Sequence, residues 1–190
     1  MHALLHLRAW QLFLLLFGLP AVLQVGVMAV LFTGQPGAWA VVGILFVAFL
    51  TLGGLLAWFY ALGTHLHRRL PATVTMSLTR FRIAALLPVA YVFSLLLYGS
   101  NAFRGGPPDG VNGGLIALLV ALHLASMACI FYCLYFTAKA LKTVERNAPA
   151  PVSEYLGDFF LLWFYPIGVW MLQPRVNHIF ATSPPETPTE

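Results

Sequence analysis

The order of apolar and polar positions divides the chain into four long hydrophobic runs joined by short polar segments. The runs cover about residues 9–32, 38–62, 83–98 and 115–137. A helix needs about 20 apolar residues to cross the hydrocarbon layer of a membrane. The pattern therefore predicts four transmembrane helices, packed as an all-α integral membrane helical bundle.

A fifth apolar segment covers about residues 155–172, and Pro166 interrupts it. Its uninterrupted part, Phe159–Leu172, would form about 21 Å of helix, which is shorter than the hydrocarbon core. We expect a short, broken C-terminal hydrophobic helix. Two placements stay open: a re-entrant or interfacial helix, and a thin fifth span.

Composition excludes a soluble protein. Sixty per cent of the 190 residues are hydrophobic and only 8% are charged, whereas soluble domains carry about 25% charged residues. Four spans leave no room for a separate aqueous domain. We expect residues 1–180 to form a single membrane domain and residues 181–190, rich in Pro, Thr and Glu, to form a disordered tail.

The basic residues predict the orientation of the chain. If the four runs cross the membrane, one side carries Arg8, Arg68, Arg69, Arg80, Arg82, Lys139, Lys142 and Arg146. The other side carries only Arg104, and the side of Arg175 depends on the fifth segment. Because short cytoplasmic loops are enriched in Lys and Arg, the sequence predicts a multi-pass protein of the cell (inner) membrane with a cytoplasmic N-terminus.

A cluster of basic residues is predicted at this cytoplasmic surface. It consists of Arg68, Arg69, Arg80, Arg82, Lys139 and Lys142. Basic side chains near a membrane surface are attracted to anionic lipid headgroups, so the bilayer itself is an expected partner. No aqueous segment shows a basic stripe with interleaved aromatic residues, and nucleic acid is not an expected partner.

His123 is the one ionisable residue deep within a predicted span. Intramembrane ionisable groups are candidates for function, here a haem or metal ligand or a proton relay. The other interpretation is a neutral imidazole that forms hydrogen bonds between helices. A di-haem site needs histidines on facing spans, and no other span has one, so we expect no bound cofactor or metal.

Small residues recur every four positions along the fourth run. They are Ala117, Ala121, Ala125, Cys129, Cys133 and Thr137. Such a seam lets another helix approach closely, and the second run offers a matching set in Gly53, Ala57 and Ala61. The two cysteines are therefore interpreted as packing residues. Glu145, Glu154 and Asp158 are interpreted as members of solvated ion pairs with Lys142 and Arg146.

The C-terminal segment has the least generic pattern in the chain. An aromatic run is followed by residues that break a helix or carry polar groups: Pro166, Gly168, Gln173, Arg175 and Asn177. Broken apolar helices that end in polar groups can build sites at membrane depth. The alternative is a kinked anchor whose Trp and Tyr side chains lie among the headgroups.

Several strings of the sequence resemble a known group of proteins. They are Leu16–Pro20, Trp58–Gly63, Ile130–Phe136, Trp163–Trp170 and Gln173–Asn177. With these strings, the chain resembles small, uncharacterised multi-span inner-membrane proteins of Bacteroidota-type bacteria. The resemblance implies a bacterial inner-membrane location and a multi-span topology, and it implies no activity.

Three functions are consistent with this sequence. The first is a non-enzymatic membrane protein that packs against partner membrane proteins, a second copy of itself or lipid. The alternative is a channel or transporter for small solutes or ions, which breaks in the helices at Pro20, Pro88 and Pro166 would favour. A membrane enzyme or haem or metal protein is the second alternative.

Overall fold

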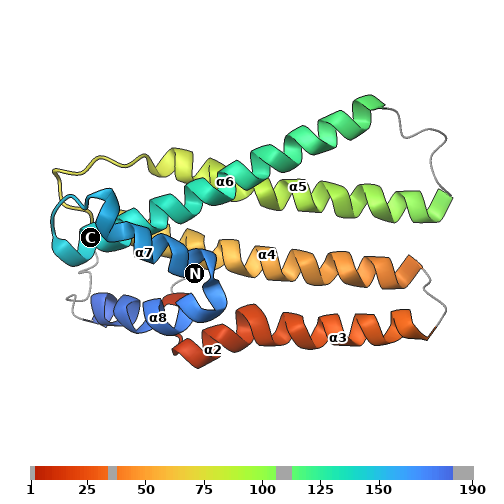
Figure 1. Cartoon of the computed structure of the whole chain (residues 1–190), viewed down its shortest axis with the longest axis horizontal. Coiled ribbons are helices and arrows are strands. Elements are labelled where there is room, and N and C mark those ends of the chain that lie inside the picture. The colour runs from red at the N-terminus through yellow and green to blue at the C-terminus, as the bar shows by residue number, and fades with distance from the viewer. Residues whose placement is uncertain (1–2, 34–37, 106–112, 182–190) are drawn as a thin grey trace, which may run out of the picture.

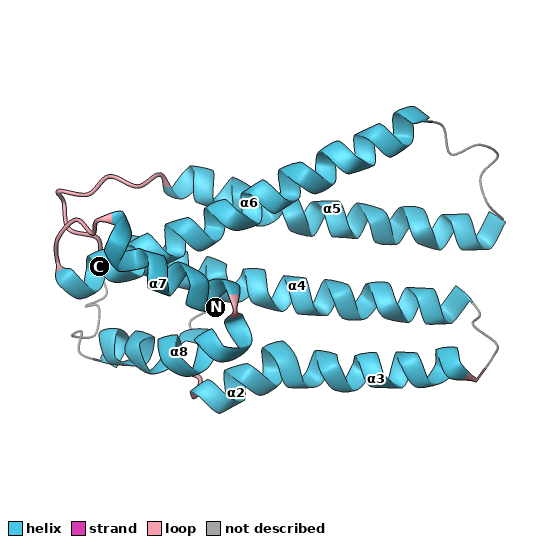
Figure 2. Ribbon diagram, in the orientation of Figure 1, coloured by secondary structure: helices cyan, strands magenta, loops and turns pink. Residues whose placement is uncertain are grey.

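The computed structural model describes residues 3–33, 38–105 and 113–181, and in these ranges every regular element is helical (Figures 1 and 2). The predicted all-α bundle is confirmed. In chain order the elements are α1 (Ala3–His6), α2 (Ala9–Phe13), the π-helical turn η1 (Leu14–Gly18), α3 (Leu19–Phe32), α4 (Ala38–His67), α5 (Leu78–Gly105), α6 (Gly113–Arg146), α7 (Val152–Trp163) and α8 (Tyr165–Ala181).

Four helical stretches are long and apolar enough to cross a membrane, as the sequence predicts. They are Ala9–Phe32, in which α2, η1 and α3 follow one another, Val42–His67, Leu78–Leu97 and Gly113–Arg146. They extend along the long axis of the molecule, whereas α7 and α8 lie beside only one end of it (Figure 1). The end of the bundle that carries α7 and α8 is called the hairpin end, and the opposite end is called the open end.

The third long helix extends beyond its predicted limits of 83–98. α5 begins at Leu78 and ends at Gly105. Ser77 caps its N-terminus, because the Ser77 hydroxyl oxygen accepts a hydrogen bond from the backbone N–H of Arg80 at 3.4 Å. The basic residues that precede the apolar run are therefore part of the first turns of the helix.

The first long helix is distorted in front of Pro20. Proline lacks the backbone N–H, and in a regular α-helix its ring collides with the carbonyl four residues earlier, here that of Leu16. The π-helical turn over Leu14–Gly18 widens the backbone at this point. Such a local widening is one of the ways in which a helix accommodates proline.

The seam of small residues on α6 is buried inside the bundle along only part of its length. Cys133 is fully buried in a cluster with Phe81 and Ala85 of α5. Gly53 and Ala57 of α4 also line a groove with residues of α5. Cys133, Gly53 and Ala57 thus lie against α5, whereas Ala117, Ala121 and Ala125 are exposed. α4 and α6 are also in contact, and Ala61 of α4 is buried in one cluster with Leu134 and Ala138 of α6.

The fifth hydrophobic segment forms two helices rather than one ending near residue 172. α7 ends at Trp163, the backbone turns at Phe164 (φ −88°, ψ 56°), and α8 continues through Pro174 to Ala181. Pro166 lies in the first turn of α8, where a missing N–H is tolerated. Of the tail predicted as disordered, Ala181 ends α8 and residues 182–190 lie outside the described residues.

α7 and α8 form an antiparallel hairpin that packs beside one end of the bundle, so the start of α7 and the end of α8 both lie at that end (Figure 1). Arg146, which ends α6, is paired with Glu154 near the start of α7. Near the end of α8, the carbonyl of Ile179 accepts a hydrogen bond from Arg69, just after α4. This geometry is the one that the re-entrant or interfacial placement predicts, and α7 and α8 are not among the helices that are long and apolar enough to cross a membrane in the described part of the chain.

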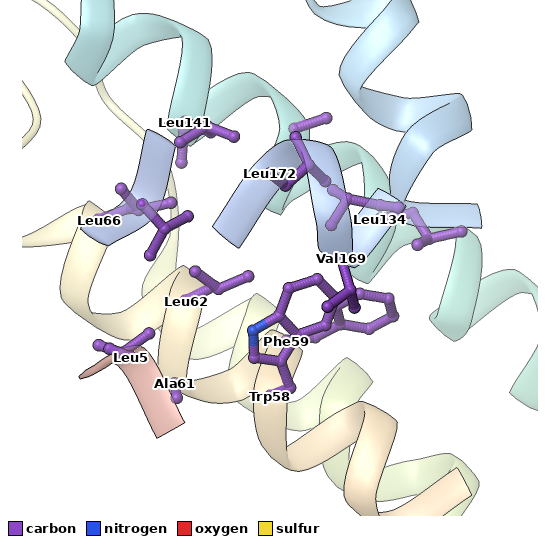
Figure 3. Close-up of a cluster of buried hydrophobic side chains, with 14 of the residues drawn as sticks. Leu5, Trp58, Phe59, Ala61, Leu62, Leu66, Leu134, Leu141, Val169 and Leu172 are labelled. Atoms are coloured by element: carbon purple, nitrogen blue, oxygen red, sulfur yellow. The ribbon is translucent and has the colours of Figure 1, made fainter. Parts of the chain in front are cut away.

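The largest apolar core lies at the hairpin end (Figure 3). Its fully or almost fully buried members include Leu5 of α1, Trp58, Phe59 and Leu62 of α4, Leu134 and Leu141 of α6, and Val169 and Leu172 of α8. Toward the open end, large apolar side chains are exposed: Val25 by 69%, Phe32 by 88% and Leu124 by 64%. An apolar surface this extensive is suited to contact with lipid or with another protein in the membrane.

Candidate functional site

Gln173 is the polar centre of the contact between α8 and the rest of the bundle. Its side chain is fully buried, on the face of α8 that also carries Val169, Leu172 and Val176. Its Oε1 accepts a hydrogen bond from Trp58 Nε1 at 3.3 Å. An unpaired buried amide would destabilise the fold by roughly 1–3 kcal/mol, so this bond helps to accommodate a polar residue in an apolar core.

α8 also binds the backbone of the N-terminal turn α1. A single helical turn leaves its last carbonyl groups without partners inside the helix. The Nε2 group of Gln173 is shared among the carbonyl oxygens of Leu4, Leu5 and Leu7 at 3.1–3.3 Å and the Asn177 Oδ1 at 3.2 Å. Asn177 Nδ2 also donates to the Leu7 carbonyl at 3.2 Å. Two amide side chains of α8 thus hold the N-terminal segment.

Arg175 joins three helices through two carboxylates. Its Nε and Nη2 donate to the two oxygens of Glu145 on α6, each at 2.7 Å. Its Nη1 and Nη2 donate to the oxygens of Asp158 on α7, at 2.6 and 3.0 Å. The guanidinium group uses its planar fork in two bidentate contacts, which is the strong form of such pairing. Asp158 is only 6% exposed, so Arg175 is the counter-ion of a nearly buried charge.

The backbones of the hairpin meet at Gly168. A Cβ atom built on Gly168 would lie 1.8 Å from the carbonyl oxygen of Leu161 on α7. Only glycine permits this approach. Gly168 therefore determines how closely α7 and α8 pack next to their turn.

A cleft of about 740 Å³ opens beside this network at the hairpin end. Its lining residues are Arg69, Val144, Glu145, Pro174, Arg175, His178 and Ile179. Arg69 donates through Nη1 to the Ile179 carbonyl at 2.6 Å, and its guanidinium carbon lies 4.3 Å from the centre of the Phe180 ring. The cleft carries both signs of charge, and Arg69, Arg175 and Glu145 already bind groups of the chain itself.

The predicted basic cluster does not converge on one point. Arg68, Arg80 and Arg82 are exposed, at the end of α4 and the start of α5. Lys139 donates to the Tyr135 hydroxyl at 3.2 Å, and Lys142 lies 3.5 Å from Glu145. These residues gather at the hairpin end of the bundle as separate basic side chains. Their contact with anionic lipid stays a prediction.

His123 lies apart from all of these residues. It is exposed on α6, and its ring centre lies 5.9 Å from that of Tyr91 on α5. In the described part of the chain, no three His, Cys, Asp or Glu side chains come close enough together to hold a metal ion. The structure therefore separates His123 from the C-terminal candidates.

Sequence reasoning missed two members of the network. The interpretation of Asp158 as part of a solvated pair is wrong, because its nearly buried carboxylate is paired with Arg175. The signal was present, since an acid at the edge of an apolar run needs a basic partner at the same depth. Trp58 carries no comparable signal, because an indole N–H in an apolar span is compatible with many partners.

No protein-family model, no curated protein sequence and no solved structure matches this chain. The buried polar groups of the C-terminal hairpin bind one another and the backbone, which is the chemistry of a structural clamp. Exposed apolar surface lies elsewhere, and the open-end half of α6 is one such surface.

Proposed function

We propose that this chain is a non-enzymatic membrane protein that acts by contact with another membrane protein, and that the open-end half of α6 is its contact surface. The observation that carries the proposal is the uneven burial of α6. Residues 116–118 and 120–125 are all exposed. From Ser126 to Thr143, by contrast, nine residues of the same helix are buried.

The exposed half of α6 has the composition of a helix-packing surface. Ala117, Ala121 and Ala125 are exposed and follow one another at four-residue intervals. Small residues at this spacing let a second helix approach to backbone distance, which supplies the dispersion contacts that drive association in lipid. The partner is either a different membrane protein or a second copy of this chain.

The channel or transporter alternative receives less support. A solute path needs polar groups that can exchange their partners with the solute. Gln173 and Asn177, the polar groups that the hairpin carries into the bundle, bind Trp58 and the backbone of α1. For the haem or metal alternative, the ring next to His123 is that of Tyr91, and among the described residues no three His, Cys, Asp or Glu side chains come together.

Photo-crosslinking in native membranes tests the contact surface. A photoreactive amino acid at Ala117 should give a discrete adduct with one protein, and an added Ala121→Leu substitution should reduce that adduct at least tenfold, because the larger side chain prevents close approach. The same probe at Val25, which is exposed on α3, is the control and should give no such adduct. Equal adducts from both positions, or lipid adducts alone, would exclude the proposed surface.

We also propose that the hairpin end faces the cytoplasm and that the membrane is the inner membrane. The chain has ten Lys and Arg residues. Because α8 ends at the hairpin end, Arg175 lies there together with eight other Lys and Arg residues. Of the ten, only Arg104, in the last turn of α5, lies at the open end. An asymmetry of nine to one supports this orientation under the positive-inside rule.

Cysteine labelling tests the orientation in a chain whose Cys129 and Cys133 are replaced by alanine. We expect a membrane-impermeant maleimide to label Thr33→Cys from outside intact cells. Ser153→Cys and Ala181→Cys should react only in inverted membranes. Labelling of Ala181→Cys from the same side as Thr33→Cys would show that the hairpin crosses the membrane, and a full reversal would refute the orientation.

A further inference from the structure

A groove of about 480 Å³ lies between the first two long helices, away from α6 and from the polar network. Its walls are one face of η1 and α3 and one face of α4, and a residue of α8 lies at its inner end. The lining residues are Phe17, Pro20, Ala21, Gln24, Ile44, Val47, Ala48, Thr51, Leu52, Leu55 and Tyr165. From Ile44 to Leu55, the wall formed by α4 is about 16 Å long.

Two polar side chains in this groove have no hydrogen-bond partner among the described residues. Within the part of the chain that the structure describes, neither the Gln24 amide nor the Tyr165 hydroxyl forms a hydrogen bond. The Thr51 hydroxyl, by contrast, donates to the Val47 carbonyl at 2.8 Å. Gln24 lies near the middle of the span Ala9–Phe32, where no water is available to replace a missing partner. An unpaired amide in such surroundings is unfavourable.

The shape and chemistry of the groove indicate which kind of ligand could form hydrogen bonds with Gln24 and Tyr165. The Gln24 NH₂ and the Tyr165 O–H can each donate a hydrogen bond, and an occupant with acceptors at membrane depth would satisfy both donors. The aromatic rings of Phe17 and Tyr165 line the inner part, which suits a flat ring. The remaining wall is apolar and suits a hydrocarbon tail. A phospholipid fits less well, because its ester carbonyls lie in the interfacial region rather than in the hydrocarbon core.

We propose that this groove binds an isoprenoid quinone. The carbonyl oxygens of the quinone ring accept hydrogen bonds from Gln24 and Tyr165, and the isoprenoid tail lies along the apolar wall formed by α3 and α4. The proposal concerns binding only. It goes beyond the proposed contact function of α6, since the two surfaces are formed by different helices.

Titration of the full-length protein in nanodiscs of phosphatidylethanolamine and phosphatidylglycerol tests this site. The probe is a ubiquinone with two isoprene units, and the readout is the saturable quenching of tryptophan fluorescence. Trp170 is a suitable reporter, because its ring lies 5.7 Å from that of Phe13, which in turn lies 5.2 Å from Phe17. We expect saturable binding, and no competition by the hydrocarbon analogue that lacks both carbonyl oxygens.

Matched variants separate hydrogen bonding from simple partition into the groove. Gln24→Leu and Tyr165→Phe should each raise the Kd about tenfold, the effect of about one lost hydrogen bond. Thr51 lines the same groove, but its hydroxyl already donates a hydrogen bond to the Val47 carbonyl. The Thr51→Val variant should therefore bind the quinone with an unchanged Kd. The thermal midpoint of ligand-free Gln24→Leu should equal or exceed that of the wild type, which shows that the variant folds. Quenching that does not saturate, or an equal Kd in wild type and both donor variants, would overturn the proposal.

Discussion

Substitution of Gly168 by alanine is expected to destabilise the protein by about 3 kcal/mol, the upper range for overpacking a close contact. The added methyl group would lie 1.8 Å from the carbonyl oxygen and 2.6 Å from the carbonyl carbon of Leu161. Both atoms belong to the backbone of α7, so no side-chain rotation can relieve the collision. The hairpin has to open, and the thermal midpoint in detergent should fall by roughly 6–12 °C.

Gly157 provides a matched control on the same hairpin. It is exposed on α7, and a Cβ atom added there meets nothing within 4 Å. Alanine is the better helix former, so Gly157→Ala should leave stability unchanged or raise it by about 0.5–1 kcal/mol. If Gly168→Ala behaved in the same way as Gly157→Ala, the close approach of α7 and α8 would not exist in the protein.

Replacement of Gln173 by leucine is expected to destabilise the protein by about 2 kcal/mol, although leucine is apolar and similar in size. The substitution leaves the Trp58 N–H, which is fully buried, without its acceptor. It also removes the donor shared by the carbonyls of α1. Unsatisfied buried groups are the costly outcome of losing a hydrogen bond. The thermal midpoint should fall by roughly 4–8 °C, and protease cleavage within the N-terminal segment should become faster.

Two comparisons show whether the loss comes from hydrogen bonding. Gln24→Leu makes the same chemical change where the amide has no partner in the described part of the chain, and it should not destabilise. In a double-mutant cycle, Trp58→Phe and Gln173→Leu should show a coupling of about 1 kcal/mol. Additive effects of these two substitutions would mean that the bond between their side chains contributes nothing.

The architecture of the four spans could be predicted because lipid imposes a simple requirement. A run such as 38–62 has to be helical to satisfy its backbone, and its length is enough for a crossing. The ends of the helices were less predictable. The helix that begins at Leu78 includes Arg80 and Arg82, because a Ser77 cap and long basic side chains let a helix extend past its apolar part.

The C-terminal hairpin shows what a linear pattern cannot reveal. The turn falls at Phe164, an aromatic residue with no turn propensity, whereas Pro174 lies inside a helix. Contacts between distant segments decide both features: Gly168 packs on Leu161, and Gln173 bonds to Trp58. The sequence pattern indicated that the polar residues after the aromatic run are candidates for a site. Their partners could not be predicted, because they lie up to 170 positions away in the chain.

The hydrogen bonds from α8 to the carbonyls of Leu4, Leu5 and Leu7 also impose an order on biosynthesis. The ribosome makes α1 first, but the amides that bind it belong to residues 173 and 177. While the four spans are being inserted, these carbonyls have only water or lipid headgroups as partners. The N-terminal segment can therefore reach its final position only after translation of α8, so the last stage of assembly is the docking of the earliest residues to be synthesised.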